Sequence, residues 1–239
     1  MEGTVRHGLT RSRRAARGAS LQLEVASRTD RGVSARGNAL TLVSPLSGPT
    51  LLRSLNGIDP NVFFTAATEI PSDFRVRRPT RRVYRYYSAE PFLRYDRVEQ
   101  AARLFSGEVD VRSFGRAIPA GAPALRTVEH VRVHGSEEGC EIEIAAPSFV
   151  WGMVRKMVAA LREVDSGRLT VPRLRSALEG SVRLSLPMAD PEPLVLWDVE
   201  YPLSWKFRWT GPNRAQTAAR MRRESRLRTE RRLILALEP

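Results

Sequence analysis

Residues 27–35 read Ser-Arg-Thr-Asp-Arg-Gly-Val-Ser-Ala, and the rest of the chain is best interpreted outward from them. They follow an alternating apolar run, residues 21–25, which predicts a half-buried strand. Asp30 therefore stands in a turn, flanked by Arg28 and Arg31. A turn carboxylate usually caps a backbone N–H group, but neighbouring guanidinium groups also favour the ionised form that a nucleophile requires. Asp30 is thus the first candidate catalytic residue.

Charge and composition point to a folded protein with a polyanionic partner. The chain has 239 residues, of which 42% are hydrophobic, and a net charge of +13. A protein this basic usually faces nucleic acid or an anionic membrane surface. Only Lys156 and Lys206 among the 39 basic residues are lysine. Arginine suits phosphate contacts, although a GC-rich genome also enriches it.

Several classes of protein are excluded by what the sequence lacks. It has no run of about 20 apolar residues, as a membrane-spanning helix needs, and no apolar signal core at its start. A single cysteine, Cys140, rules out an internal disulfide and a cysteine zinc site. The sequence contains no basic helix with a broad apolar face, so it does not predict binding to a membrane surface. These absences favour a cytoplasmic protein without a metal.

Hydrophobic periodicity predicts interspersed strands and helices, as in an α+β protein. The predicted strands are residues 21–25, 39–43, 62–64, 83–87, 127–133, 141–144 and 194–201. The predicted helices are residues 50–56, 98–105, 149–164 and 174–178. We divide the chain into two α+β halves, residues 1–92 and 93–205, and an arginine-rich tail, residues 206–239. The tail holds ten basic and three acidic residues, so it is either a solvated extension or an additional phosphate contact.

Tyr84 is the second candidate site residue. Strand alternation across residues 82–86 places it on the same face as Arg82 and opposite Arg85. An aromatic ring beside arginines can stack on a base while the arginines hold its phosphates. The alternative is a tyrosine that merely packs on the sheet with its hydroxyl satisfied.

Arg155 is the third candidate. It adjoins the apolar face of the helix predicted over residues 149–164. Its side chain either extends to solvent, as arginines usually do, or enters a cleft and pairs with a buried carboxylate.

These segments together resemble the TruA-type tRNA pseudouridine synthases. Residues 28–35 are similar to the archaeal and eukaryotic variant of the family's aspartate motif, residues 82–86 to its second motif, and residues 149–157 to its third. Phe74 and Arg77 resemble the element before the second motif. Residues 107–114 resemble the linking segment, with valines where histidine and phenylalanine are usual, and residues 194–201 resemble the closing strand. The motifs occur in the family's order over roughly residues 1–203.

The resemblance implies a fold, a reaction and an assembly. The fold would be two similar ferredoxin-like halves that form one extended mixed or antiparallel sheet with a central basic cleft. The reaction would convert uridine to pseudouridine in tRNA, around positions 38–40 of the anticodon stem-loop, without cofactor or metal. Family members act as homodimers, so a homodimer is expected here.

The resemblance also assigns roles to individual residues. Asp30 would be the catalytic residue, Tyr84 would stack on the target base, and Arg155 would pair with Asp30. Arg28 would order the loop and contact RNA, and Val150 would lie under the target base. The other candidate RNA-binding residues are Arg31, Arg77, Arg82, Arg85 and Lys156.

Residues 1–5 resemble the segment that follows the family's first strand, so the resemblance predicts that this strand is missing here. Either the start site of the sequence is misassigned or the sequence is a fragment, because loss of that strand would expose neighbouring backbone groups. Its loss also suggests an alternative function, a non-catalytic RNA-binding remnant of the same fold. A ribosomal-type structural protein, suggested by charge alone, would not need the ordered motifs.

Overall fold

The computed structural model describes residues 23–116, 118, 124–136, 139–208 and 211–237. These fall into two compact units. One comprises residues 1–24, 40–74 and 203–239, and the other comprises residues 25–39 and 75–202. The prediction of a missing first strand concerns residues outside the described ranges. In the described part of the chain, no helix is both long and apolar enough to cross a membrane.

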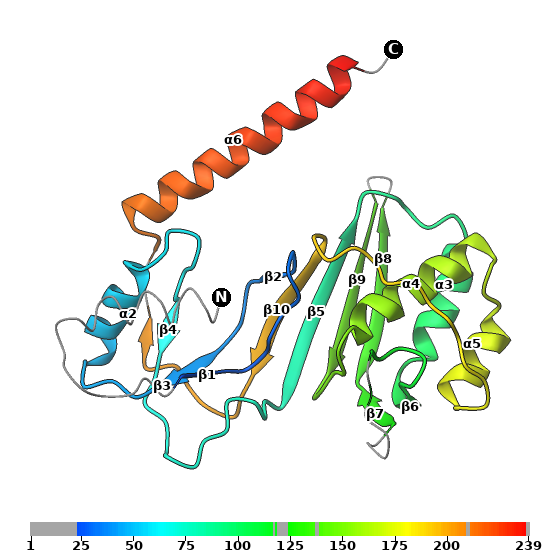
Figure 1. Cartoon of the computed structure of the whole chain (residues 1–239), viewed down its shortest axis with the longest axis horizontal. Helices are drawn as coiled ribbons and strands as arrows, with labels where there is room; N and C mark the ends of the chain where they lie inside the picture. The colour runs from blue at the N-terminus through cyan, green and yellow to red at the C-terminus, as the bar shows by residue number, and fades with distance from the viewer. Residues whose placement is uncertain (1–22, 117, 119–123, 137–138, 209–210, 238–239) are drawn as a thin grey trace. The chain divides into compact units, whose positions relative to one another are not determined.

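The unit of residues 25–39 and 75–202 is built on a five-stranded mixed sheet in the order β2-β10-β5-β9-β8 (Figure 1). These strands are β2 (Ser34–Ala35), β10 (Leu194–Glu200), β5 (Arg81–Ser88), β9 (Gly139–Ala146) and β8 (His130–Ser136). Only β2 runs parallel to its neighbour, and the other three pairings are antiparallel. The unit also contains the small sheet of β6 (Gly107–Asp110) and β7 (Leu125–Val128).

Cross-strand register explains how this sheet buries one face. Tyr84 lies opposite Leu196 on one side and Ile144 on the other, and Ile144 lies opposite Val131. All four side chains are buried. Because side chains alternate along a strand, this row and the parallel row two residues away share the core face.

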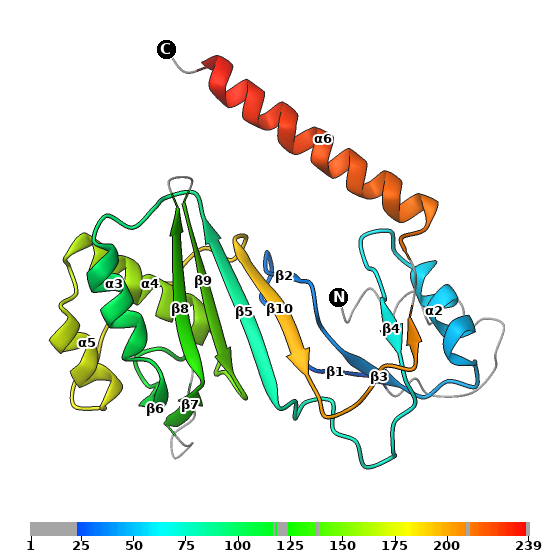
Figure 2. The same ribbon diagram turned by 180° about the vertical axis from the view of Figure 1, so that it is seen from behind.

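Three helices accompany the sheet: α3 (Tyr95–Arg103), α4 (Met153–Ser166) and α5 (Val171–Leu178). The front and back views place them near the β8 end of the sheet (Figures 1 and 2), and α3 contacts β8, α4 and α5. Helix α4 begins at Met153, not at residue 149 as predicted. Its N-cap Gly152 has φ +77°, a left-handed conformation that interrupts the helix pattern.

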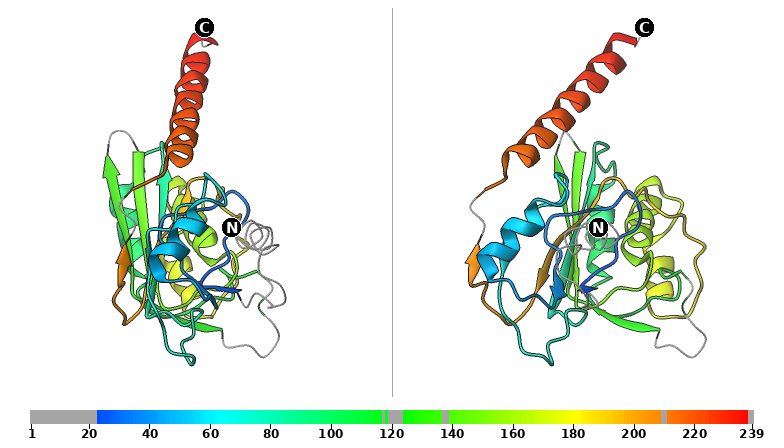
Figure 3. Two further views of the ribbon diagram at one scale, coloured as in Figure 1. Left: turned by 90° about the vertical axis from the view of Figure 1, so that its left-hand side faces the viewer. Right: turned by 60° about the vertical axis from the view of Figure 1, so that its left-hand side comes forward.

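The unit of residues 1–24, 40–74 and 203–239 contains α2 (Gly48–Asn56), which contacts a pair of short antiparallel strands. These are β4 (Ala66–Ala67) and β11 (Phe207–Arg208). A second pair joins β1 (Leu23–Val25) to β3 (Leu40–Leu42). The tail forms α6 (Arg214–Leu237), one unbroken helix in every view (Figure 3).

The predicted strand over residues 62–64 is wrong. The backbone of Phe64 is satisfied by a side chain instead of a neighbouring strand: its N–H donates to Asn56 Oδ1 at 2.8 Å, and its carbonyl accepts from Asn56 Nδ2 at 3.0 Å. Asn56 is buried, so it supplies locally what a sheet partner would supply. The run of three apolar residues, 62–64, gives no sign of such a partner.

Candidate active site

The loop that carries Asp30 is a tight turn joined directly to the sheet. The N–H of Val33 donates to the carbonyl of Asp30 at 3.1 Å, and Gly32 takes φ +93° inside this turn. A Cβ on Gly32 would come within 2.9 Å of Pro191 and of Glu192, so only glycine fits. The turn then leads into β2, which pairs with β10. The position of Asp30 is therefore fixed from its C-terminal side.

Arg82 fixes the same loop from its N-terminal side. Its guanidinium donates to Ser27 Oγ at 2.8 Å and to the carbonyl oxygens of Ala26, Arg77 and Pro147 at 3.1, 3.0 and 2.5 Å. Burial lowers the pKa of Arg82, and nearby protein oxygens replace the water that it loses. Four bonds to the protein give Arg82 a positioning role.

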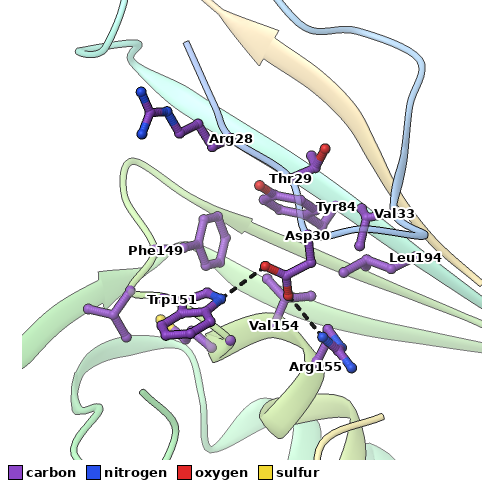
Figure 4. Close-up of a pocket in the computed structure, with 13 residues that line it drawn as sticks. Arg28, Thr29, Asp30, Val33, Tyr84, Phe149, Trp151, Val154, Arg155 and Leu194 are labelled. Atoms are coloured by element: carbon purple, nitrogen blue, oxygen red, sulfur yellow. Dashed lines mark hydrogen bonds and ion pairs between the residues drawn. The ribbon is translucent and has the colours of Figure 1, made fainter. Parts of the chain in front are cut away.

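The carboxylate of Asp30 accepts from two different donors, one on each oxygen (Figure 4). Arg155 Nη1 lies 2.9 Å from Oδ2, and Trp151 Nε1 lies 2.9 Å from Oδ1. Arg155 Nε also donates to the carbonyl of Ala189 at 2.6 Å, which fixes the plane of the guanidinium. The Asp30–Arg155 contact predicted from sequence is thus present in the structure, across 125 residues of chain.

Asp30 and Tyr84 line one pocket of about 420 Å³, a size typical of ligand pockets. Figure 4 shows the Tyr84 ring next to the Asp30 side chain. Tyr84 meets Phe149 edge to face, with ring centroids 5.2 Å apart. Burial raises the pKa of Tyr84, so its hydroxyl stays neutral at physiological pH. Phe149 lines the pocket as well, and the remaining lining residues are Arg28, Thr29, Val33, Val150, Trp151, Gly152, Met153, Val154, Arg155 and Leu194.

The other sequence-predicted residues divide between the pocket and places away from it. Arg28 and Val150 line the pocket, whereas Arg31 and Arg77 are exposed and do not. Lys156 is half-buried, with Nζ 3.4 Å from the carbonyl of Ser113.

Arg85 lies on the opposite face of β5 from Tyr84, as strand alternation predicts. Its guanidinium pairs with Glu143 at 2.8 Å and Glu141 at 3.4 Å on β9. It also lies over the ring of Trp197, 4.0 Å from the centroid. The structure does not bring Arg85 together with the residues around Asp30.

Trp151 is the site residue that sequence reasoning missed. It precedes α4, and its side chain is 55% exposed at the pocket while Arg116 lies over its ring. The apolar spacing gave no signal for it, because Trp151 lies before the N-cap Gly152, whose left-handed φ of +77° takes residue 151 out of the helical pattern. From this position its indole N–H reaches the same carboxylate as Arg155.

The arrangement suits a reaction that needs an ionised carboxylate next to a flat, apolar ligand. Two donors hold the charge of Asp30, and Tyr84 and Phe149 supply aromatic surface next to it. Among the described residues, no group of three or more histidine, cysteine or acidic side chains is placed to hold a metal ion.

Comparison with known proteins identifies the family. The family model described as tRNA pseudouridine synthase matches residues 101–202. The tRNA pseudouridine synthase A of Pyrococcus abyssi is 36% identical over 179 residues, which cover 74% of this chain and 67% of the relative. The enzyme of the same name from Thermococcus kodakarensis is 38% identical over 180 residues, with the same coverage. That of Methanothermobacter thermautotrophicus is 32% identical over 190 residues, or 78% of this chain and 67% of the relative. The chain therefore belongs to the TruA-type family of tRNA pseudouridine synthases, a family of isomerases.

Proposed function

We propose that this protein converts uridine to pseudouridine in the anticodon stem-loop of tRNA, around positions 38–40, with Asp30 as the residue that attacks the target nucleotide. The observation that carries the proposal is the ion pair between Asp30 and Arg155 in the pocket that Tyr84 also lines. A carboxylate held in this way has a fixed orientation and lies in a pocket that can admit a ligand.

The reaction moves the uracil ring from one glycosidic bond to another. The N1–C1′ bond breaks, the ring turns within the pocket, and a C5–C1′ bond forms. The proton on C5 is lost and N1 gains one, so substrate and product are isomers. The base must leave the helical stack before the pocket can enclose it.

Asp30 begins this sequence by one of three routes. It adds to C6 of the ring, displaces the base at C1′, or removes the C2′ proton as uracil leaves C1′, which gives a glycal that regains a proton at C2′ when the C5–C1′ bond forms. A primary isotope effect from deuterium at C2′ distinguishes the third route from the first two.

The neighbouring residues have separate tasks in this scheme. Tyr84 stacks on the extruded base, and Val150 contacts its other surface. Arg155 pairs with the Asp30 carboxylate inside a partly apolar pocket, where an unpaired carboxylate is costly. Arg28 orders the loop and contacts RNA.

Arg31, Arg77 and Lys156 are proposed to contact the phosphate backbone near the pocket. The exposure of both arginines supports this role. For Arg82 and Arg85, the bonds to protein oxygens favour structural roles.

We also carry over the architecture implied by the family resemblance. It consists of two ferredoxin-like halves, residues 1–92 and 93–205, with a basic cleft and a homodimeric assembly. Sedimentation equilibrium tests the dimer directly, because a monomer at micromolar concentration contradicts it.

The test of Asp30 is the Asp30→Asn variant, which keeps the shape of the side chain and removes its charge. We expect no pseudouridine in unmodified tRNA, while the Kd for tRNA changes little. Asp96→Asn, at an exposed position on α3, is the matched control. Pseudouridine formation by Asp30→Asn would contradict the assignment, and tRNA binding by the unaltered chain without turnover would instead indicate a non-catalytic RNA-binding remnant.

A further inference from the structure

Helix α6 is a long, basic surface element that the reaction at Asp30 does not use. It follows the residues that the family model matches, which end at residue 202. Every residue from Arg220 to Leu237 is exposed, and Gln216 is the only side chain that the described helix buries. An exposed helix of this length needs either its own stabilisation or a partner.

The start of α6 is held in place, so the helix is not simply a solvated tail. The carbonyl of the Asn213 side chain accepts from the N–H of Gln216, and the carbonyl of the Gln216 side chain accepts from the N–H of Asn213, both at 2.9 Å. This reciprocal pair is a capping box. Gln216 Nε2 also donates to Asn56 Oδ1 and to the carbonyl of Val62, both at 3.0 Å. The buried amides fasten the first turn of α6 to the end of α2.

The charge of α6 is strongly unbalanced. The helix contains eight arginines and two glutamates. Glu224 pairs with Arg228 at 2.6 Å and Glu230 with Arg226 at 2.7 Å. Among the described residues, no carboxylate lies within salt-bridge reach of the other arginines, which are Arg214, Arg220, Arg222, Arg223, Arg231 and Arg232.

The distribution of these charges indicates which class of partner α6 can bind. Successive residues of a helix point about 100° apart, so Arg220, Arg222 and Arg223 face three different directions. The exposed apolar residues near the C-terminal end, such as Leu233 and Leu235, are likewise spread around the axis. A helix that docks in a protein groove or on a membrane shows one apolar stripe, and α6 has none.

Like charges four residues apart destabilise a helix, and Arg222–Arg226 and Arg228–Arg232 are such pairs. A polyanion would relieve this repulsion. We propose that α6 is an RNA-binding arm that contacts the phosphodiester backbone of the tRNA substrate. This inference rests on the proposed function for its choice of tRNA.

The arm would contribute affinity and not chemistry, because phosphate contacts position RNA without reading its bases. Each neutralised phosphate releases counterions, so binding through α6 depends steeply on salt. Removing four contacts is expected to lower the slope of log affinity against log salt by about 3 to 4. At low salt the Kd should rise on the order of tenfold or more, while kcat at saturating tRNA stays unchanged.

The experiment compares two fourfold variants of the full chain. The arm variant replaces Arg220, Arg222, Arg223 and Arg232 with glutamine. The control replaces four exposed arginines on α3 and α5 with glutamine, namely Arg97, Arg103, Arg173 and Arg175. Both lose the same net charge. The Kd for unmodified tRNA is measured at several salt concentrations, with circular dichroism to confirm that both variants keep their helices.

A large fall in salt slope for the arm variant, with a small one for the control, supports the proposal. Equal falls in both variants overturn it, since net charge alone would then explain binding. Unchanged tRNA affinity with lost binding to phosphatidylserine vesicles also overturns it, in favour of a membrane. Binding is measured without turnover, so a failure of the arm is distinct from a failure of the proposed reaction.

Discussion

Trp151 Nε1 donates a 2.9 Å hydrogen bond to Oδ1 of Asp30, the oxygen that does not contact Arg155. The carboxylate is therefore held in one orientation by two side chains, Trp151 just before α4 and Arg155 in its first turn. Because Trp151 is more than half exposed, a ligand entering the pocket can displace its ring without unfolding anything.

Trp151→Phe keeps an aromatic ring and removes the N–H donor. A hydrogen bond to a charged group contributes about 1.5–3 kcal/mol, less where water competes, so we expect kcat to fall about fivefold to tenfold. Single-turnover pseudouridine formation measures the effect. Trp205→Phe, at another exposed tryptophan, should leave the rate unchanged. An unaltered rate in Trp151→Phe would show that the indole N–H does not position Asp30.

Arg155→Lys keeps the charge but loses the geometry of the contact. A lysine ammonium cannot donate to Asp30 and to the carbonyl of Ala189 as the planar guanidinium does. We expect kcat to fall on the order of 100-fold, with a loss of about 1–3 kcal/mol in the free energy of unfolding. Urea unfolding and kinetics of the same preparations separate the two effects. Arg162→Lys, on the same helix but outside the pocket lining, controls for substitution within α4. Full activity of Arg155→Lys contradicts the need for a planar guanidinium that donates to both Asp30 and Ala189.

Tyr84→Phe should act almost like the unaltered protein, because the ring and its edge-to-face contact with Phe149 remain. Tyr84→Leu removes the stacking surface, and stacking contributes about 1–3 kcal/mol per base, which corresponds to a loss of about tenfold to 100-fold in kcat/KM. Tyr86→Leu is the control, since Tyr86 is buried in the neighbouring row and lies outside the pocket lining. Comparable losses in kcat/KM for both leucine variants would mean that packing, not stacking, explains the effect.

Glu143 makes the stability of the five-stranded sheet depend on pH. Burial alone would raise its pKa, but hydrogen bonds from His130 and Arg85 outweigh burial and lower the pKa below its usual value near 4.5. Arg132 also faces it at 3.6 Å, and Glu141 shares Arg85. A lowered pKa means that the ionised form stabilises the fold above about pH 4.5, and this contribution is lost as the pH falls through the lower folded-state value.

Glu143→Gln should therefore be less stable than the unaltered chain at pH 7, by about 1–3 kcal/mol, and the difference should shrink below about pH 4.5. Urea unfolding between pH 3 and 7 measures it. Glu108→Gln, at an exposed position on β6, should show no such trend. A stability difference that does not change with pH would contradict the role of the Glu143 charge.

The sequence predicted the parts of the site that depend on strand alternation and on motif order. Tyr84 and Arg85 face opposite sides of β5, and Asp30 meets Arg155. It did not predict features in which a single side chain replaces regular structure. Asn56 bonds to the backbone of Phe64 in place of a strand, and nothing in the apolar run of residues 62–64 reveals it.

The prediction of where α4 begins was wrong for a related reason. The apolar spacing of residues 149–164 is helical throughout, but Gly152 takes a left-handed conformation that delays the helix. That delay leaves Trp151 outside the helix and close enough to bond Asp30. The prediction located the segment correctly and missed the local backbone geometry that gives Trp151 its contact.

The pairing of β2 with β10 has a consequence for how the protein is made. As the chain leaves the ribosome, Asp30 is synthesised well before Arg155, and Arg155 before Leu196, whose carbonyl accepts from the N–H of Arg36 just after β2. The turn thus acquires its cation and then its neighbouring strand late in synthesis, because such distant contacts wait for the sheet. The turn that carries Asp30 therefore reaches its final geometry only after residue 196 has been synthesised and β10 has joined the sheet.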